Sequence, residues 1–172
     1  MPEMDGITAL RAIREKSNVP VILITAKSED ADKVLGLDVG ADDYITKPFG
    51  VMELISRVKA MLRRSQKSQE KDKVLKLGNI VLDREKHSVT VGKEPVELTY
   101  KEYELLVYLA ENQNRVVSRD ELLDKLWDWR ADVETRTLDI HIKTLRQKLG
   151  EEAGHYIKTV RSVGYRFMKP QE

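Results

Sequence analysis

Residues 63–73 divide the chain into two parts with different hydrophobic patterns. This stretch reads RRSQKSQEKDK, contains no aliphatic residue and mixes charges of both signs, a composition that is typical of a linker. Before it, apolar residues recur mainly at helical spacing, whereas after it several segments show the period of two that strands have. We therefore expect a first unit at residues 1–64 and a second unit at residues 74–172, joined by a linker at residues 65–73.

The first unit alternates helices and strands. Helical periodicity at residues 7–15 leads to residues 19–25, a continuous β-branched run of the kind that is buried in a parallel sheet. A helix at residues 30–39 ends at Gly40, and residues 43–46 follow as a short strand. A last amphipathic helix has apolar positions at Val51, Leu54, Ile55, Val58, Met61 and Leu62. This alternation predicts an α/β unit with a parallel, doubly wound sheet.

The second unit begins with short strands and continues with helices. Antiparallel strands are predicted at residues 74–77, 79–83, 88–91 and 96–98. Two capping boxes then mark helix starts, one formed by Thr99 with Glu102 and one by Ser118 with Glu121. With a third helix that ends at Leu149 and a hairpin after it, the second unit is predicted to be an α+β domain.

The third helix, residues 136–149, has two different faces. One face is an apolar stripe suited to a core, formed by Leu138, Ile142, Leu145 and Leu149. The second face mixes small, β-branched and basic side chains, and its members are Thr137, Ile140, His141, Thr144 and Lys148. These residue types contact thymine methyls and base edges in DNA complexes. Arg136, Lys143 and Arg146 flank this face, where phosphates would lie.

A basic hairpin follows this helix after Gly150. Residues 155–169 contain no acidic residue, and their basic side chains are Lys158, Arg161, Arg166 and Lys169. A helix for the major groove beside a basic wing predicts a winged helix-turn-helix. An ordinary amphipathic surface helix with solvated charges would show the same pattern, so the pattern alone leaves both interpretations open.

Composition excludes several classes of protein. The net charge is only +1, so any field that attracts DNA must come from local clustering. The absence of cysteine excludes disulfides and thiolate metal sites, and it is typical of a reducing cytoplasm, where we expect the protein. His87, His141 and His155 lack ligand spacing, so no metal site is expected. The longest apolar runs, residues 19–24 and 105–110, are too short to span a bilayer, and no membrane partner is expected.

Three motifs in the second unit are LTYKEYELLVYLAENQNRVVSRDELLDKLW, TRTLDIHIKTLRQKLG and YIKTVRSVGYRF. They lie within residues 98–167, and this segment closely resembles the effector domain of OmpR/PhoB-type response regulators. The resemblance implies a sequence-specific DNA-binding transcription regulator, not an enzyme, that binds double-stranded DNA at repeated half-sites. Residues 129–132 resemble the loop that contacts RNA polymerase in that family.

The same resemblance assigns DNA contacts to individual residues. Those expected to face bases are Thr137, Ile140 and Thr144. Those expected to face phosphates are Arg136, His141, Lys143 and Arg146. Arg161, in the hairpin, is expected to enter the minor groove.

The first unit carries the motifs MPEMDG, VPVILITA and GADDYITKPF. They are similar to the latter part of a phosphoacceptor receiver domain, which implies the C-terminal half of a CheY-like fold. Thr25 and Lys47 would then be switch residues that approach an acyl phosphate, with a cis peptide bond before Pro48. Tyr44 resembles the aromatic switch. From the residues alone, a strand-end hydroxyl, a surface lysine and a half-buried tyrosine are ordinary interpretations of these positions.

The acceptor aspartate of that family would lie four residues before Pro2, and therefore before Met1. The acidic pair that holds Mg²⁺ would be missing as well, so Mg²⁺ is expected only with a complete receiver, and no cofactor is expected here. A self-hydrolysing phosphoryl acceptor is not expected for the same reason. A full-length form would receive its phosphoryl group from a sensor histidine kinase. A fragment or a misplaced start is favoured over a natural short form.

The receiver resemblance also implies a homodimer. The matching interface positions are Lys33, Asp38, Asp42, Asp43, Glu53, Arg57, Lys59 and Arg64. Complementary charges on one patch suit a twofold interface, although a solvated charged face is the simpler interpretation, because exposed pairs contribute only about 0 to 1 kcal/mol each. The alternative function is a dimerisation or regulatory fragment without useful DNA binding.

Overall fold

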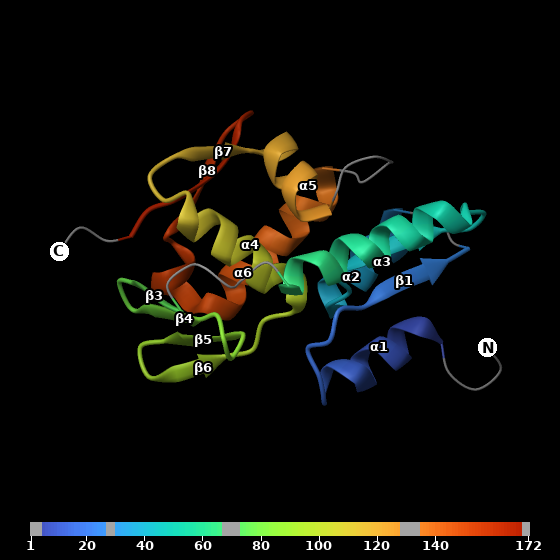
Figure 1. The fold of residues 1–172 in the computed structure, drawn as a ribbon, viewed down its shortest axis with the longest axis horizontal. Coiled ribbons are helices and arrows are strands. Elements are labelled where there is room, and N and C mark those ends of the chain that lie inside the picture. Colours follow the sequence, from blue (N-terminus) through green and yellow to red (C-terminus); the bar gives the residue numbers. More distant parts are fainter. Residues whose placement is uncertain (1–4, 27–29, 67–72, 128–134, 170–172) are drawn as a thin grey trace.

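The computed structural model describes residues 5–26, 30–66, 73–127 and 135–169. The two units lie side by side (Figure 1). The elements of the first unit are α1 (Gly6–Arg14), β1 (Ile22–Thr25), α2 (Asp30–Val39), β2 (Asp43–Thr46) and α3 (Val51–Gln66). The predicted alternation of helices and strands in the first unit is therefore confirmed.

β1 and β2 pair in parallel, with Ile22 opposite Asp43 and Thr25 opposite Thr46. Only the last four residues of the β-branched run at 19–25 belong to β1. α2 stops before Gly40, whose φ of +114° lies in the region that a residue without Cβ adopts at little cost. This turn brings the chain directly into β2.

The second unit contains two antiparallel sheets and three helices. β3 (Val74–Leu77), β4 (Ile80–Asp83), β5 (Ser88–Val91) and β6 (Glu94–Val96) form one sheet in chain order. The remaining elements are α4 (Tyr100–Glu111), β7 (Val116–Ser118), α5 (Arg119–Trp127), α6 (Thr135–Gly154), β8 (Ile157–Val160) and β9 (Gly164–Phe167). The order β7-β9-β8 makes β8 and β9 the wing beside α6. Both predicted fold classes are confirmed, a receiver-type α/β unit and a winged helix.

Helix boundaries in the second unit follow local hydrogen bonds. The Thr99 hydroxyl accepts from the Glu102 amide at 3.4 Å, and a Glu102 carboxylate oxygen accepts from the Thr99 amide at 2.8 Å. Ser118 accepts from the Glu121 amide at 3.1 Å. In α6, the backbone of Gly150 is not helical, with a φ of +81°, so the apolar stripe ends where the sequence indicates.

One strand prediction was wrong, and one strand was missed. The fourth strand lies at Glu94–Val96 instead of residues 96–98, because Leu98 is buried and Thr99 already caps α4. β7 was not predicted at all. It pairs with β9 so closely that a Cβ on Gly164 would lie 2.0 Å from the Val117 carbonyl oxygen.

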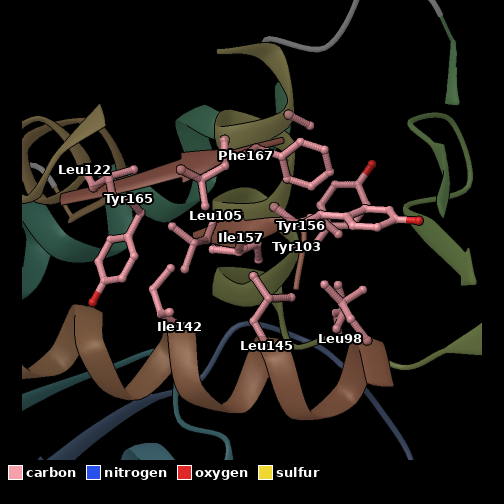
Figure 2. Packing of buried hydrophobic residues seen from close by; sticks show 14 of the residues in the cluster. Leu98, Tyr103, Leu105, Leu122, Ile142, Leu145, Tyr156, Ile157, Tyr165 and Phe167 are labelled. Atoms are coloured by element: carbon pink, nitrogen blue, oxygen red, sulfur yellow. The ribbon is translucent and has the colours of Figure 1, made fainter. Parts of the chain in front are cut away.

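The apolar stripe of α6 anchors the helix in the core of the second unit. Figure 2 shows Ile142 and Leu145 directed from α6 toward Leu105 and Ile157. The complete stripe is buried, and its members are Leu138, Ile142, Leu145 and Leu149. Because this face is held in the core, the second face of α6 points away from it.

Candidate nucleic-acid interface

Four of the five residues on the second face of α6 are buried, Lys148 is exposed, and α2 of the first unit packs against this helix. The exposed fractions of its side chains are 1% for Thr137, 8% for Ile140, 1% for His141 and 8% for Thr144. Ile140 belongs to an apolar cluster of the first unit that also contains Leu10, Leu37, Ala41 and Tyr44. We call this contact the docked arrangement. In it, the side chains predicted to face bases are buried, and their contact with DNA stays a prediction.

Asp42 joins the two units from a fully buried position. One carboxylate oxygen accepts from the Arg14 guanidinium and from the Val21 amide, both at 2.8 Å. The other accepts from the Lys101 amide at 2.7 Å, at the N-terminus of α4, where a negative charge is favourable. The Asp42 carbonyl accepts from the Trp127 indole at 3.3 Å. Burial raises the pKa of the Asp42 carboxyl, and the amides of Lys101 and Val21 and the charges of Arg14 and Lys101 act in the opposite direction.

Two further contacts connect helices of the two units. The Tyr100 hydroxyl at the start of α4 donates to the Met61 carbonyl of α3 at 2.8 Å, in a buried position. Lys143 of α6 pairs with Asp38 of α2 at 3.3 Å. The second contact is largely exposed, so it contributes little to docking compared with the buried ones.

The His141 ring lies at the centre of the docked arrangement. Its centroid is 5.3 Å from that of Trp127, and its Nε2 has no hydrogen-bond partner among the described residues. Burial lowers the pKa of His141 to about 4, with nearby Lys101 acting in the same direction and Glu102 against it. His141 is therefore neutral at pH 7 in this conformation.

Glu102 and Lys148 form an ion pair next to this ring. Lys148 Nζ lies 2.7 Å from a Glu102 carboxylate oxygen. Burial acts to raise the pKa of Glu102, but the Lys148 charge and the capping hydrogen bond hold it below its usual value. Lys148, expected on the DNA-facing side, is therefore already paired inside the chain.

The basic residues predicted to flank the DNA differ in their surroundings. Arg136, Lys143 and Arg161 are exposed. Arg146 instead holds the wing on α6, because its guanidinium donates to the Ile157 carbonyl at 2.7 and 3.1 Å and to the Thr159 hydroxyl at 2.9 Å. Sequence reasoning missed this structural role, since the contact spans eleven residues across the Gly150 turn.

The residues assigned to the receiver switch are only partly brought together. Thr25 and Lys47 meet at the carboxyl ends of β1 and β2, where the Lys47 amide donates to the Thr25 carbonyl at 2.7 Å. The peptide bond between Lys47 and Pro48 is cis, as the resemblance implied. Tyr44 packs in the apolar cluster with Ile140 instead. Within the described ranges, no group of three or more His, Asp or Glu side chains could hold a metal ion.

The predicted dimer residues are engaged within the chain in the docked arrangement. Arg57 pairs with Asp43 and with Glu53, both at 2.9 Å, while Asp38 and Asp42 contact the second unit. Lys59 is exposed. The side chains of Lys33 and Arg64 lie outside the described part of the structure, as does the loop at residues 129–132. The homodimer interface remains a prediction.

Comparison with known proteins places both units. Residues 1–59 match the family model of the response regulator receiver domain, and residues 92–167 match that of the C-terminal part of transcriptional regulatory proteins. The response regulator ArlR of Staphylococcus epidermidis is 47% identical over 166 residues, which cover 96% of this chain and 74% of ArlR.

Solved structures of other proteins are also similar to this chain. A cysteine-to-serine mutant of RitR matches with a TM-score of 0.77 at 28% identity, over 98% of this chain and 76% of that one. The RstA DNA-binding domain of Klebsiella pneumoniae, in complex with the RstA box, matches with a TM-score of 0.52 at 33% identity. That match covers 56% of this chain and 98% of the RstA chain.

Each unit thus has a counterpart of known type, and ArlR matches across both. Among the described helices, none combines the length and apolar character that crossing a bilayer requires. The winged fold, the receiver-type strands with their cis proline, and the identity to ArlR over nearly the whole chain agree with one another. The chain therefore belongs to the OmpR/PhoB-type response regulators.

Proposed function

We propose that this transcription regulator, an output component of a two-component system, reads a specific DNA sequence with α6 and its wing. The observation that carries the proposal is the two-faced character of α6. Its apolar stripe is fixed in the core, while its second face presents small and β-branched side chains between basic ones. That combination suits a helix that enters the major groove.

Individual contacts follow from the faces of α6. Thr137, Ile140 and Thr144 would contact base edges, while phosphates would be contacted by Arg136, His141, Lys143 and Arg146. Arg161, exposed between β8 and β9, would enter the minor groove. Arg146 was expected at a phosphate, and its bonds to the wing also allow it to fix the angle between wing and helix.

The partners of the regulator are part of the same proposal. A single winged helix reads one short half-site, so two copies on repeated half-sites would give strong binding. The homodimer would use the charged surface of α2, β2 and α3. A sensor histidine kinase would control the full-length form, and residues 129–132 would contact RNA polymerase. We propose that the protein is located in the cytoplasm. We propose no catalytic step for this chain.

Two substitutions separate base contacts from phosphate contacts. Binding is measured to two duplexes, one selected from a random library and one of unrelated sequence. Thr144→Ala should change the difference in binding free energy between these two duplexes by about 1 to 3 kcal/mol. Arg136→Ala should instead weaken both and reduce the salt slope by about one. Lys93→Ala removes a positive charge from the turn between β5 and β6 and serves as the matched control. Equal effects of the first two substitutions on both duplexes would contradict the assignment.

A second candidate function is supported by the burial of the same face. If the docked arrangement persisted in the presence of DNA, the chain would act as a dimerisation or regulatory fragment without useful DNA binding. Thr137 and His141 are each only 1% exposed, which favours this alternative. The titrations above decide between the two, because a docked fragment would bind the selected duplex no more tightly than the unrelated one.

A further inference from the structure

A buried histidine lies where the two units join, and the proposed DNA binding does not account for its burial. The His141 side chain projects from α6 against Trp127 of α5 and lies next to the backbone of Asp42. Its Nε2 is buried and has no hydrogen-bond partner among the described residues. The ring therefore occupies a site that accommodates its neutral form.

A protonated ring would not fit the same site. Both ring nitrogens of imidazolium are donors, so Nε2 would carry a buried N–H without an acceptor. The charged groups around the ring are Asp42 of the first unit, Lys101 and Glu102 of α4, and Lys148 of α6. Both carboxylates are already engaged, Glu102 by Lys148 and Asp42 by Arg14 and backbone amides. The Lys101 ammonium lies 4.9 Å from the Trp127 ring centre and opposes a second positive charge.

Separation of the units would remove this restriction. Undocking would take the Asp42 backbone away from the His141 ring and the first unit away from α6, so we expect the ring to meet water in the undocked form. An exposed imidazole takes up a proton with a pKa of about 6.5. Proton binding at His141 is therefore linked to whether α6 is docked.

We infer that the contact between α6 and the first unit is a proton-sensitive lock on the DNA-binding face, with His141 as the titrating group. Acid releases α6, because the undocked form binds the proton that the docked form excludes. The lock itself does not require DNA binding, but its consequence for DNA rests on the proposed function.

The sign and size of the effect follow from linkage. The pKa of His141 is lowered in the docked form, to about 4, so docking is fully stable above about pH 6.5 and weakens as the pH falls from there. Between pH 7.5 and pH 5.5 the undocking equilibrium constant should rise about tenfold. Asp42 works in the opposite direction, because burial raises the pKa of its carboxyl in the docked form.

Histidine titration by NMR tests the lock without DNA. The second unit can serve as the undocked reference, because its core lies wholly within residues 77–167, and the DNA-binding domain of CpxR, which matches 57% of this chain over 98% of its own length, has a crystal structure without a receiver. We expect the His141 imidazole to titrate well below pH 6 in the full chain and near pH 6.5 in residues 74–172. The same pKa in both would overturn the inference, since the burial would then be unrelated to docking.

Two histidine substitutions isolate the group. The affinity of the full chain for the selected duplex should rise with acid more steeply than that of residues 74–172, by about tenfold between pH 7.5 and pH 5.5. His155→Gln, at an exposed histidine, should keep this excess, whereas His141→Gln should abolish it. An excess that persists in His141→Gln would refute the inference. Normal titration shifts without any specific DNA binding would instead contradict the proposed function and leave the lock intact.

A chemical cross-link provides an independent check. The chain has no cysteine, so Asp38→Cys with Lys143→Cys places two unique thiols on α2 and α6. A short bis-maleimide should join them in the docked form and make specific DNA binding insensitive to acid, compared with the same variant before cross-linking. Continued acid-stimulated binding by the cross-linked chain would show that release of α6 is not the responsible step.

Discussion

Removal of one hydroxyl group should release α6 for DNA without changing any residue on its second face. Tyr100→Phe deletes the oxygen that donates to the Met61 carbonyl at 2.8 Å, which is a contact between the units. Met61 lies inside α3, so its carbonyl keeps the ordinary helical hydrogen bond after the change. The substitution therefore weakens docking without leaving an unpaired buried carbonyl.

The expected magnitude comes from a single neutral hydrogen bond. Such a bond contributes about 0.5 to 1.5 kcal/mol net, and about 1 kcal/mol corresponds to a fivefold change in an equilibrium constant at 25 °C. If most molecules are docked, the apparent DNA affinity equals the intrinsic affinity multiplied by the undocked fraction. Tyr100→Phe should thus raise the apparent affinity about fivefold.

Fluorescence anisotropy with a labelled duplex at fixed salt and pH 7.5 measures this change. Tyr103→Phe is the matched control, because it removes a tyrosine hydroxyl from the same helix whose 3.4 Å bond to the Asp83 carbonyl lies within the second unit. The control should leave the affinity unchanged. An unchanged affinity for Tyr100→Phe, or an equal rise for both variants, would refute the view that docking limits DNA binding.

Three further predictions concern stability and phosphorylation. Gly164→Ala should lower the free energy of unfolding by about 3 kcal/mol or more, measured by urea denaturation, because its Cβ would lie 2.0 Å from the Val117 carbonyl oxygen; a wild-type midpoint would contradict this. Hydrogen bonds from Arg115 lower the pKa of Glu121 to about 2, so stability present above about pH 4.5 should be lost toward pH 2, and Arg115→Ala should show less of this loss in thermal unfolding between pH 6 and pH 3. An equal loss of stability in the wild type and in Arg115→Ala would show that the contact between Arg115 and Glu121 is not the cause. Acetyl phosphate with Mg²⁺ should give no phosphoryl adduct on Asp5 by mass spectrometry, because its carboxylate caps α1; a base-labile adduct there would disprove it.

The elements that could be predicted from the sequence are those determined by nearby residues. β2, β3 and β5 have the predicted bounds, since each is a short β-branched or alternating run between turn residues. The capping box of Thr99 and Glu102 is formed by both of its hydrogen bonds. In these places the atoms that stabilise the element lie within a few residues of one another, so the local pattern contains the necessary information.

The elements that were missed depend on distant parts of the chain. β7 is three residues long and gains its hydrogen bonds from β9, which begins at Gly164. No local periodicity can indicate such a strand. Likewise, the Asp42 carboxylate meets the Lys101 amide across 59 positions, and an acidic residue in a charged loop gives no sign of the helix that docks on it.

The burial of the second face of α6 could not be predicted from the sequence pattern. An amphipathic pattern identifies which side of a helix enters its own core, but it does not say what covers the other side. Thr137, Ile140 and Thr144 have the size and mixed polarity that suit a DNA groove, yet all three are buried here, and Ile140 packs with Leu37 of α2. On our proposal the same surface contacts DNA, so any free energy that stabilises docking would reduce the apparent affinity for DNA by the same amount. Substitutions in α2 that strengthen its contact with α6 should therefore weaken DNA binding, even though they change no residue of α6.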